Sequence, residues 1–194
     1  LAAAGAAGLL RRVGIPPRAL PTAGVALALA WSIGSHWGIY RDAALHAAGL
    51  RSRAHWLARF RTGRDYSFAA NARVAQYVAA TTRPGTGLLV WGFEPSVYLL
   101  AERRPPTRFF FNVPLAAPFT PESWRAELLA DLRHRPPELF LVVRNDAIPW
   151  ASGRRDDSAA QLEGWTELSR WLAANYRLET HVEDFDIYRR VPVR

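Results

Sequence analysis

The chain has 194 residues, a net charge of +8, no cysteine and no methionine. Residues 1–64 contain nine arginines and one acidic residue, whereas residues 65–194 contain sixteen arginines and sixteen acidic residues. The neutral second part gives no reason to expect a nucleic-acid partner, and the missing cysteines exclude disulfides and cysteine-ligated metal sites.

Residues 19–40 contain no charged side chain and are flanked by Arg18 and Arg41. A helix of this length extends for about 33 Å, enough to cross the apolar core of a bilayer. The preceding residues 1–18 combine an apolar decamer, which does not start with methionine, and a loop with three arginines. We therefore expect a piece of a larger multi-pass membrane protein. In it, residues 1–18 are the tail of one transmembrane helix and a cytoplasmic loop, and residues 19–40 are a complete transmembrane helix.

The composition of residues 19–40 is typical of a helix in a bundle. Strongly apolar residues are few, and alanine, glycine and serine are frequent. Gly34 and Gly38 have the GxxxG spacing that allows a second helix to approach closely. Other transmembrane helices of the same protein are thus the expected partners. Two alternatives remain open, a secretory signal peptide and a buried helix of a soluble protein.

Residues 41–64 form a basic juxtamembrane segment. We expect a linker helix that lies on the membrane lipid, with Trp56 and Phe60 among the lipids and the arginines near phosphate. A solvated linker helix is the alternative. Charge leaves the orientation open, because the arginines in the loop before Ala19 compete with those after Tyr40.

Residues 65–194 alternate between helical and strand patterns. We expect helices over 71–82, 94–101, 121–135 and 158–176, strands over 88–91, 108–111 and 139–143, and a terminal hairpin over 178–187. This alternation predicts one soluble α/β domain over 65–194, with a small parallel or mixed sheet flanked by helices and a C-terminal hairpin.

Motifs of known chemistry are weak in this domain. The turn at Gly85 and Gly87 lacks the third glycine of a dinucleotide-binding loop and precedes a strand. The five histidines show no spacing typical of metal ligands. Asp184 and Asp186 have the DxD form of one glycosyltransferase class, but we expect solvated turn carboxylates there. We therefore predict no catalytic residue, metal or cofactor in this chain.

Polar residues follow the strands expected at 88–91 and 139–143. In open α/β sheets, ligands bind at the carboxyl ends of the strands. We therefore predict that Glu94, Tyr98, Asn145 and Asp146 share one rim. Arg103 and Arg104 follow the short helix nearby, and arginine is suited to bidentate phosphate contacts. The alternative is that these two arginines pair with Glu94 and Glu102 on a solvated surface.

One stretch resembles a known family. It includes Val78–Gly85, the run from Leu89 to Phe109 that contains Trp91-Gly92-Phe93-Glu94-Pro95, the Pro136-Pro137-Glu138 segment, Asn175–Leu178 and Asp186–Arg190. Over roughly residues 70–190, the sequence resembles the extracytoplasmic C-terminal domain of bacterial GT-C membrane glycosyltransferases. The related group comprises protein-mannosyltransferase-like and aminoarabinose-transferase-like enzymes.

The resemblance implies transfer of a sugar from a polyprenyl-phosphate carrier at the outer face of the plasma (inner) membrane. Enzymes of this family carry their catalytic carboxylate in the first external loop, so no position here inherits a catalytic role. The resemblance also implies that residues 41–194 face outward as a scaffold or acceptor-shaping domain of a multi-pass enzyme. The alternative from a different class is a membrane-tethered, non-catalytic α/β binding or interaction module.

Overall fold

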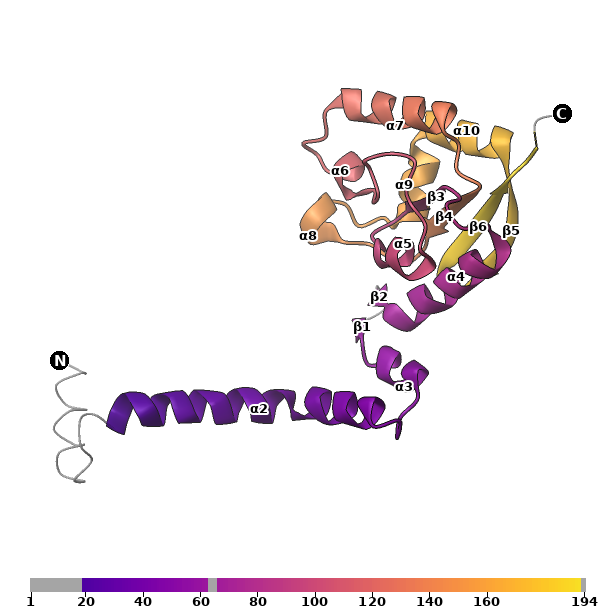
Figure 1. The fold of residues 1–194 in the computed structure, drawn as a ribbon. Helices are drawn as coiled ribbons and strands as arrows, with labels where there is room; N and C mark the ends of the chain where they lie inside the picture. Colours follow the sequence, from indigo (N-terminus) through magenta and orange to yellow (C-terminus); the bar gives the residue numbers. More distant parts are fainter. Residues whose placement is uncertain (1–18, 63–65, 193–194) are drawn as a thin grey trace, which may run out of the picture. The chain divides into compact units, whose positions relative to one another are not determined.

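The computed structural model describes residues 19–62 and 66–192, which divide into two units, Leu1–Trp56 and Leu57–Arg194 (Figure 1). The predicted transmembrane tail and cytoplasmic loop at residues 1–18 lie outside the described residues. The second unit begins at Leu57, ahead of the domain start predicted at residue 65.

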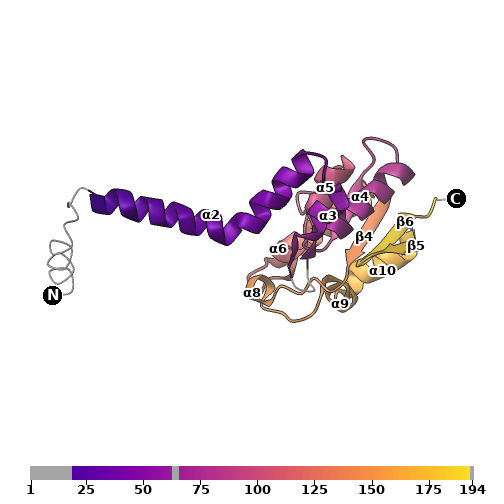
Figure 2. The ribbon, with the colours of Figure 1, turned by 90° about the horizontal axis from the view of Figure 1, so that it is seen from below.

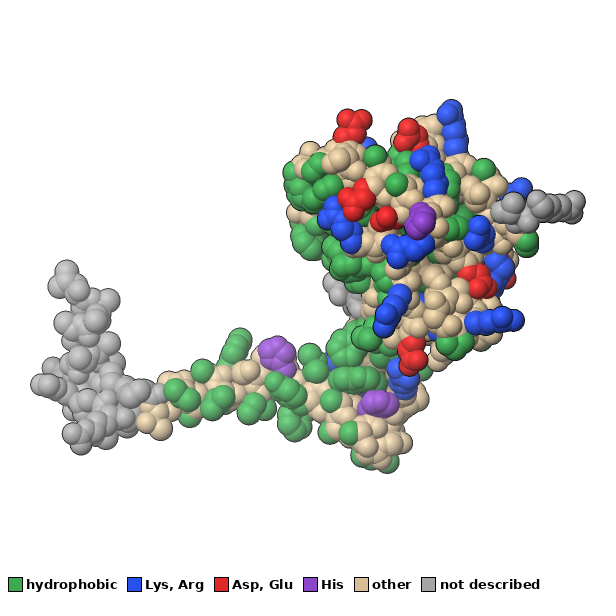
Figure 3. All heavy atoms as spheres, turned by 45° about the horizontal axis from the view of Figure 1, so that its top comes forward, with side chains coloured by type: hydrophobic (Ala, Val, Ile, Leu, Met, Phe, Trp, Pro, Cys, Tyr) green, Lys and Arg blue, Asp and Glu red, His purple; other side chains and the backbone are tan. Residues whose placement is uncertain are grey.

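The first unit consists mainly of one long helix, α2, over Ala19–Ala47. Within the described part of this helix the large apolar side chains are exposed: Val25, Leu27, Leu29, Trp31, Ile33, Trp37 and Ile39. Figure 3 shows apolar side chains along α2. Across residues 19–62 and 66–192, no helix has the combination of length and apolar character that crossing a membrane requires.

The prediction of one linker helix over residues 41–64 is wrong in the extent of the helix. Residues 41–47 continue α2, and a separate short helix, α3, covers Arg53–Ala58. Between them Gly49 adopts a positive φ of 72°, which ends α2, and the carbonyl of Leu45 accepts bonds from the two residues that follow Gly49. The carboxylate of Asp42, 3% exposed, then pairs with Arg41 and Arg51 at 3.2 and 3.1 Å. The turn is thus held by charge pairing inside the first unit.

The second unit confirms the α/β prediction with a mixed four-stranded sheet. The strands are β3 (Leu88–Trp91), β4 (Leu139–Val143), β5 (Tyr176–Val182) and β6 (Phe185–Arg190), in the order β3-β4-β6-β5. Strands β3 and β4 are parallel, and β6 is antiparallel to both β4 and β5. The predicted C-terminal hairpin is confirmed by the pairing of β5 with β6. A two-stranded ribbon, β1 (Arg61–Thr62) and β2 (Tyr66–Ser67), precedes the sheet.

Helices cover both faces of this sheet (Figures 1 and 2). Alternate strand residues point to opposite faces, so Leu88 and Val90 pack with α4 (Phe68–Thr81) and α5 (Ser96–Ala101). Leu89 and Trp91 pack on the other side with α7 (Glu122–His134), α9 (Ser158–Gly164) and α10 (Thr166–Asn175). The short helices α6 (Val113–Ala116) and α8 (Pro149–Ser152) lie in the loops beyond the strand ends. Every residue of β3 and β4 is therefore buried.

Two predicted elements differ from the structure. The strand expected over 108–111 is irregular, because the backbone N–H of Phe109 bonds to the Thr107 hydroxyl at 3.3 Å and not to a neighbouring strand. The helix expected over 158–176 breaks at Trp165, after Gly164, into α9 and α10. The side chain that caps α9 is that of Asp157, which accepts from Ala160 N at 2.9 Å.

Candidate functional site

The carboxyl ends of β3 and β4 lie next to each other, because the two strands are parallel and paired from Leu88 with Leu139 to Trp91 with Val142. Gly92, which follows β3, permits this closeness. A Cβ atom at Gly92 would lie 2.1 Å from Val143 Cγ2 and 3.1 Å from Asp146 Oδ2. The absence of a side chain at Gly92 lets the loops after both strands meet, and these loops carry Glu94 and Asp146.

Asp146 joins these loops to α9. Its carboxylate is 4% exposed and accepts three hydrogen bonds: from Ser158 N at 2.8 Å, from Ser158 Oγ at 2.6 Å and from Phe93 N at 3.1 Å. Burial raises the pKa of Asp146, and the bonds from Ser158 oppose that shift. Because all three donors come from the protein itself, the carboxylate has a structural role.

Glu94 is the second buried carboxyl, with 3% of its surface exposed. The Asn71 amide of α4 donates to Glu94 Oε2 and also to Ser96 Oγ at 2.8 Å. Burial, with smaller contributions from Asp146 and Asp184, raises the pKa of Glu94 to about 7, although the Asn71 bond lowers it. A carboxyl of this kind exchanges its proton near neutral pH.

The structure places the two other predicted rim residues in structural roles. The Tyr98 hydroxyl accepts from Val90 N of β3 at 2.8 Å, and burial raises the pKa of this phenol. Asn145 lies beside Asp146 on the rim with a positive φ of 59°. Its backbone N–H donates to Asp157 Oδ2 at 3.0 Å, and its amide donates to Asp184 Oδ1 at 3.4 Å. Asparagine tolerates this left-handed conformation better than most residues.

Arg103 and Arg104 lie at the opposite end of β3 from the rim. The carbonyl of Arg104 accepts from Leu88 N, at the start of the strand. Arg103 is 7% exposed, and its guanidinium donates to Thr82 O and Ala101 O at 2.8 Å and to Thr82 Oγ1 at 3.0 Å. These contacts tie the ends of α4 and α5 together. They give no support to a phosphate contact by Arg103, and they also differ from the surface pairing with Glu94 or Glu102.

The expectation that Asp184 and Asp186 are both solvated is wrong for Asp186, which is 2% exposed. Its carboxylate accepts from Arg144 Nε at 2.7 Å and lies 2.6 Å from Nδ1 of His181, its partner across β5 and β6. The bonds from Arg144 and His181 lower the pKa of Asp186 against the opposing effect of burial. Both faces of the sheet are covered, so the alternation that buries Phe185 and Ile187 on one side also buries Asp186 on the other.

Sequence reasoning missed the residues that hold the two rim carboxyls. Asn71 and Ser158 are 1% and 2% exposed, and Asn112 donates to Ser158 Oγ at 2.7 Å. Their separation in sequence from Glu94 and Asp146 left no pattern that could reveal the contacts. Within residues 19–62 and 66–192, no cluster of histidine and acidic side chains could hold a metal ion.

Comparisons with protein-family models, with curated proteins and with solved structures found no match for this chain.

Proposed function

We propose that the chain forms part of a multi-pass glycosyltransferase of the plasma (inner) membrane that uses a polyprenyl-phosphate-linked sugar. In this proposal the second unit, Leu57–Arg194, is a non-catalytic domain on the outer side, and α2 packs among other helices of the same protein. The resemblance of the sequence between Val78 and Arg190 to the extracytoplasmic domain of this family supports the proposal.

The observation that carries the membrane part of the proposal is the surface of α2. Successive residues of a helix are rotated by about 100°. The exposed Val25, Leu27 and Ile33 therefore point in different directions, and Trp31 and Trp37, which are 79% and 60% exposed, cover further directions. A helix with apolar side chains around its whole circumference needs apolar surroundings on every side. Neighbouring helices in a membrane bundle would supply them.

The geometry of the rim supports a non-catalytic role for the second unit. Both carboxylate oxygens of Asp146 already accept hydrogen bonds from Ser158 and Phe93, and the Glu94 carboxyl is buried and bonded to Asn71. Neither carboxyl has the partly open setting in which a base meets a substrate within about 3 Å. We therefore assign the transfer chemistry to a part of the enzyme outside this domain.

The test uses membranes that contain the intact protein and a radiolabelled polyprenyl-phosphate sugar. We expect the protein to stay in the membrane after carbonate washing and to transfer the label. Residues 57–194 alone should transfer none of the labelled sugar. Glu94→Gln in the intact protein should transfer sugar within about threefold of the original rate, since Glu94 takes no part in the chemistry. Turnover by residues 57–194 alone, or loss of transfer in a folded Glu94→Gln protein, would contradict the proposal.

A further inference from the structure

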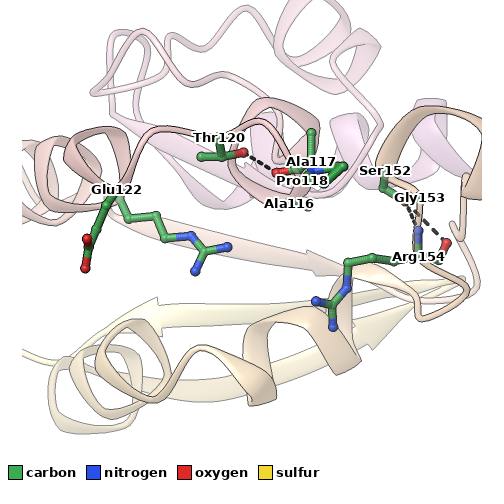
Figure 4. A pocket seen from close by; sticks show the side chains of 9 residues that line it. Ala116, Ala117, Pro118, Thr120, Glu122, Ser152, Gly153 and Arg154 are labelled. Atoms are coloured by element: carbon green, nitrogen blue, oxygen red, sulfur yellow. Dashed lines mark hydrogen bonds between the residues drawn. The ribbon is translucent and has the colours of Figure 1, made fainter.

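A hollow of about 410 Å³ opens in the second unit between the loop after α6, the start of α7 and the turn after α8 (Figure 4). Its lining residues are Ala116, Ala117, Pro118, Thr120, Glu122, Arg125, Ser152, Gly153 and Arg154. A smaller hollow of about 80 Å³ adjoins it, shares Arg125 and Arg154, and reaches Trp91 and Trp165. The larger hollow has the size of an ordinary site for a small molecule.

Arg125 is fixed in place without an acidic partner in the described part of the chain. Its Nε and one Nη nitrogen donate to the carbonyl of Leu115 at 3.3 and 3.2 Å. Its guanidinium also lies over the ring of Trp165, 5.4 Å from the centroid. The Leu115 carbonyl thus holds one edge of the guanidinium, and the Trp165 ring holds one face. The second Nη nitrogen has no hydrogen bond among the described residues.

Arg154 is oriented in a similar way from the other wall. Its Nε donates to Asp156 Oδ1 at 2.9 Å, and one Nη nitrogen contacts Asp156 Oδ2. Ser152 Oγ accepts from the backbone N–H of Arg154 at 3.2 Å, which fixes the start of the side chain. The second Nη nitrogen again has no described partner. Two preoriented guanidiniums therefore line the same hollow, each with a nitrogen available for an acceptor.

The geometry points to a binding site for a phosphate ester of a small hydroxylated compound, such as a sugar phosphate, with the phosphate at Arg125 and Arg154. Arginine binds phosphate oxygens well because its N–H groups are strong charge-assisted donors in a fixed plane. Glu122, on the same helix as Arg125, lies on the side of the hollow opposite Arg154 (Figure 4). A carboxylate there repels a second anionic group and accepts bonds from hydroxyls. The lining thus favours a ligand that is anionic at one end only.

The same phosphate chemistry can come from a soluble ester or from a lipid headgroup. Phe119 lies between the lining residues Pro118 and Thr120, and Trp150 lies two residues before the lining residue Ser152. They are 72% and 81% exposed and offer an apolar surface next to the hollow. The experiment therefore has two arms. The inference needs only the second unit and does not rest on the proposed function.

In the first arm the full 194-residue protein, in mild detergent at low salt, is titrated with inorganic phosphate, glucose 1-phosphate and glucose. Binding is measured by calorimetry and by the change in the NMR signal of the Trp165 indole N–H. We expect glucose 1-phosphate to bind more tightly than inorganic phosphate, and glucose not to bind. The second arm measures binding to vesicles with phosphatidate against vesicles of phosphatidylcholine alone. Binding only in the second arm assigns the phosphate to a lipid, and binding in neither arm overturns the proposal.

Variants locate the site. Arg125→Gln and Arg154→Gln should each weaken phosphate-ester binding about tenfold, the usual cost of one charge-assisted contact. Arg155→Gln is the matched control, because Arg155 is exposed, next in sequence and outside the lining, and it should bind as before. Glu122→Gln should reduce the preference for glucose 1-phosphate over inorganic phosphate. Should Arg125→Gln fail to fold, Arg154→Gln and Glu122→Gln carry the test. Unchanged affinity in both would overturn the assignment.

Discussion

At the scale of single residues, Glu94 makes stability depend on pH. The carboxyl is 3% exposed, and burial raises its pKa from 4.5 to about 7. Between these two pH values the folded protein holds a proton that the unfolded chain has already released. Folding stability therefore decreases as pH rises through this window and levels off above it.

We expect Glu94→Gln to remove this dependence. The amide keeps an acceptor for Asn71 and cannot ionise. The free energy of unfolding of the original protein, measured relative to the variant by urea titration, should fall by about 3 kcal/mol between pH 4.5 and pH 7.5. Glu127→Gln is the control: the Arg108 bond lowers the pKa of Glu127, so its contribution is lost as pH falls. A difference between Glu94→Gln and the original protein that stays constant with pH would contradict the burial argument.

The sequence predicted which residues lie on the rim only where sheet topology alone determines their position. Parallel strands bring their carboxyl ends together, and this rule correctly placed Glu94 and Asp146 beside each other. It could not reveal that Ser158 saturates Asp146, because a hydrogen bond across distant segments depends on how α9 packs. Arg103 shows the same limit, since nothing local indicates that its charge is used by carbonyls at the ends of α4 and α5.

At the scale of elements, β3 is an edge strand whose outer backbone groups are covered from within the chain. Val90 N bonds to the Tyr98 hydroxyl, and Leu88 N bonds to the carbonyl of Arg104, so α5 and the segment after it close the edge. Open edge strands are sites of association between chains. The return of the chain over β3 thus keeps the sheet to four strands.

Tyr98→Phe should open this edge at one point. The change leaves Val90 N–H buried without an acceptor, which costs about 1–3 kcal/mol of folding stability. Amide exchange at Val90 should accelerate more than at Leu89, which lies on the same strand. Tyr188→Phe is the control, because the Tyr188 hydroxyl, unlike that of Tyr98, has no hydrogen bond within the described part of the chain. Unchanged exchange at Val90 would mean that another group, such as water, already satisfies this N–H.

The elements that sequence predicted well are those with strong and local signals. The apolar runs gave β3 and β4, and the alternation near the C-terminus gave the hairpin of β5 and β6. The break at Trp165 was missed, since the apolar spacing continues from Leu162 to Leu172 across it. The strand expected over 108–111 failed because its backbone N–H groups bond locally: Phe109 N–H donates to the Thr107 hydroxyl and Phe110 N–H donates to the carbonyl of Arg108.

At the scale of the whole molecule, the two units differ in how far they bury their apolar side chains. The second unit buries most of its large apolar side chains on both faces of the sheet, in two clusters. The first unit leaves those of α2 exposed, and its described ion pairs involve Asp42, near the end of the helix. Sequence captured this contrast through the separation of charge between the two parts. It could not locate the unit boundary, which depends on the turn at Gly49 and on α3.

We therefore expect residues 57–194 to fold and remain monomeric alone, while the full chain associates through α2. Helices packed on both faces of the sheet supply the core of the shorter chain, so its midpoint of thermal unfolding should lie within a few degrees of the corresponding transition in the full chain. The full chain should sediment as oligomers in water and as a monomer in detergent micelles, because α2 exposes Trp31, Ile33 and Trp37. Replacing these three residues with glutamine is the matched control and should abolish association without altering the second unit. A full chain that stays monomeric without detergent would remove the main reason to place α2 among membrane helices.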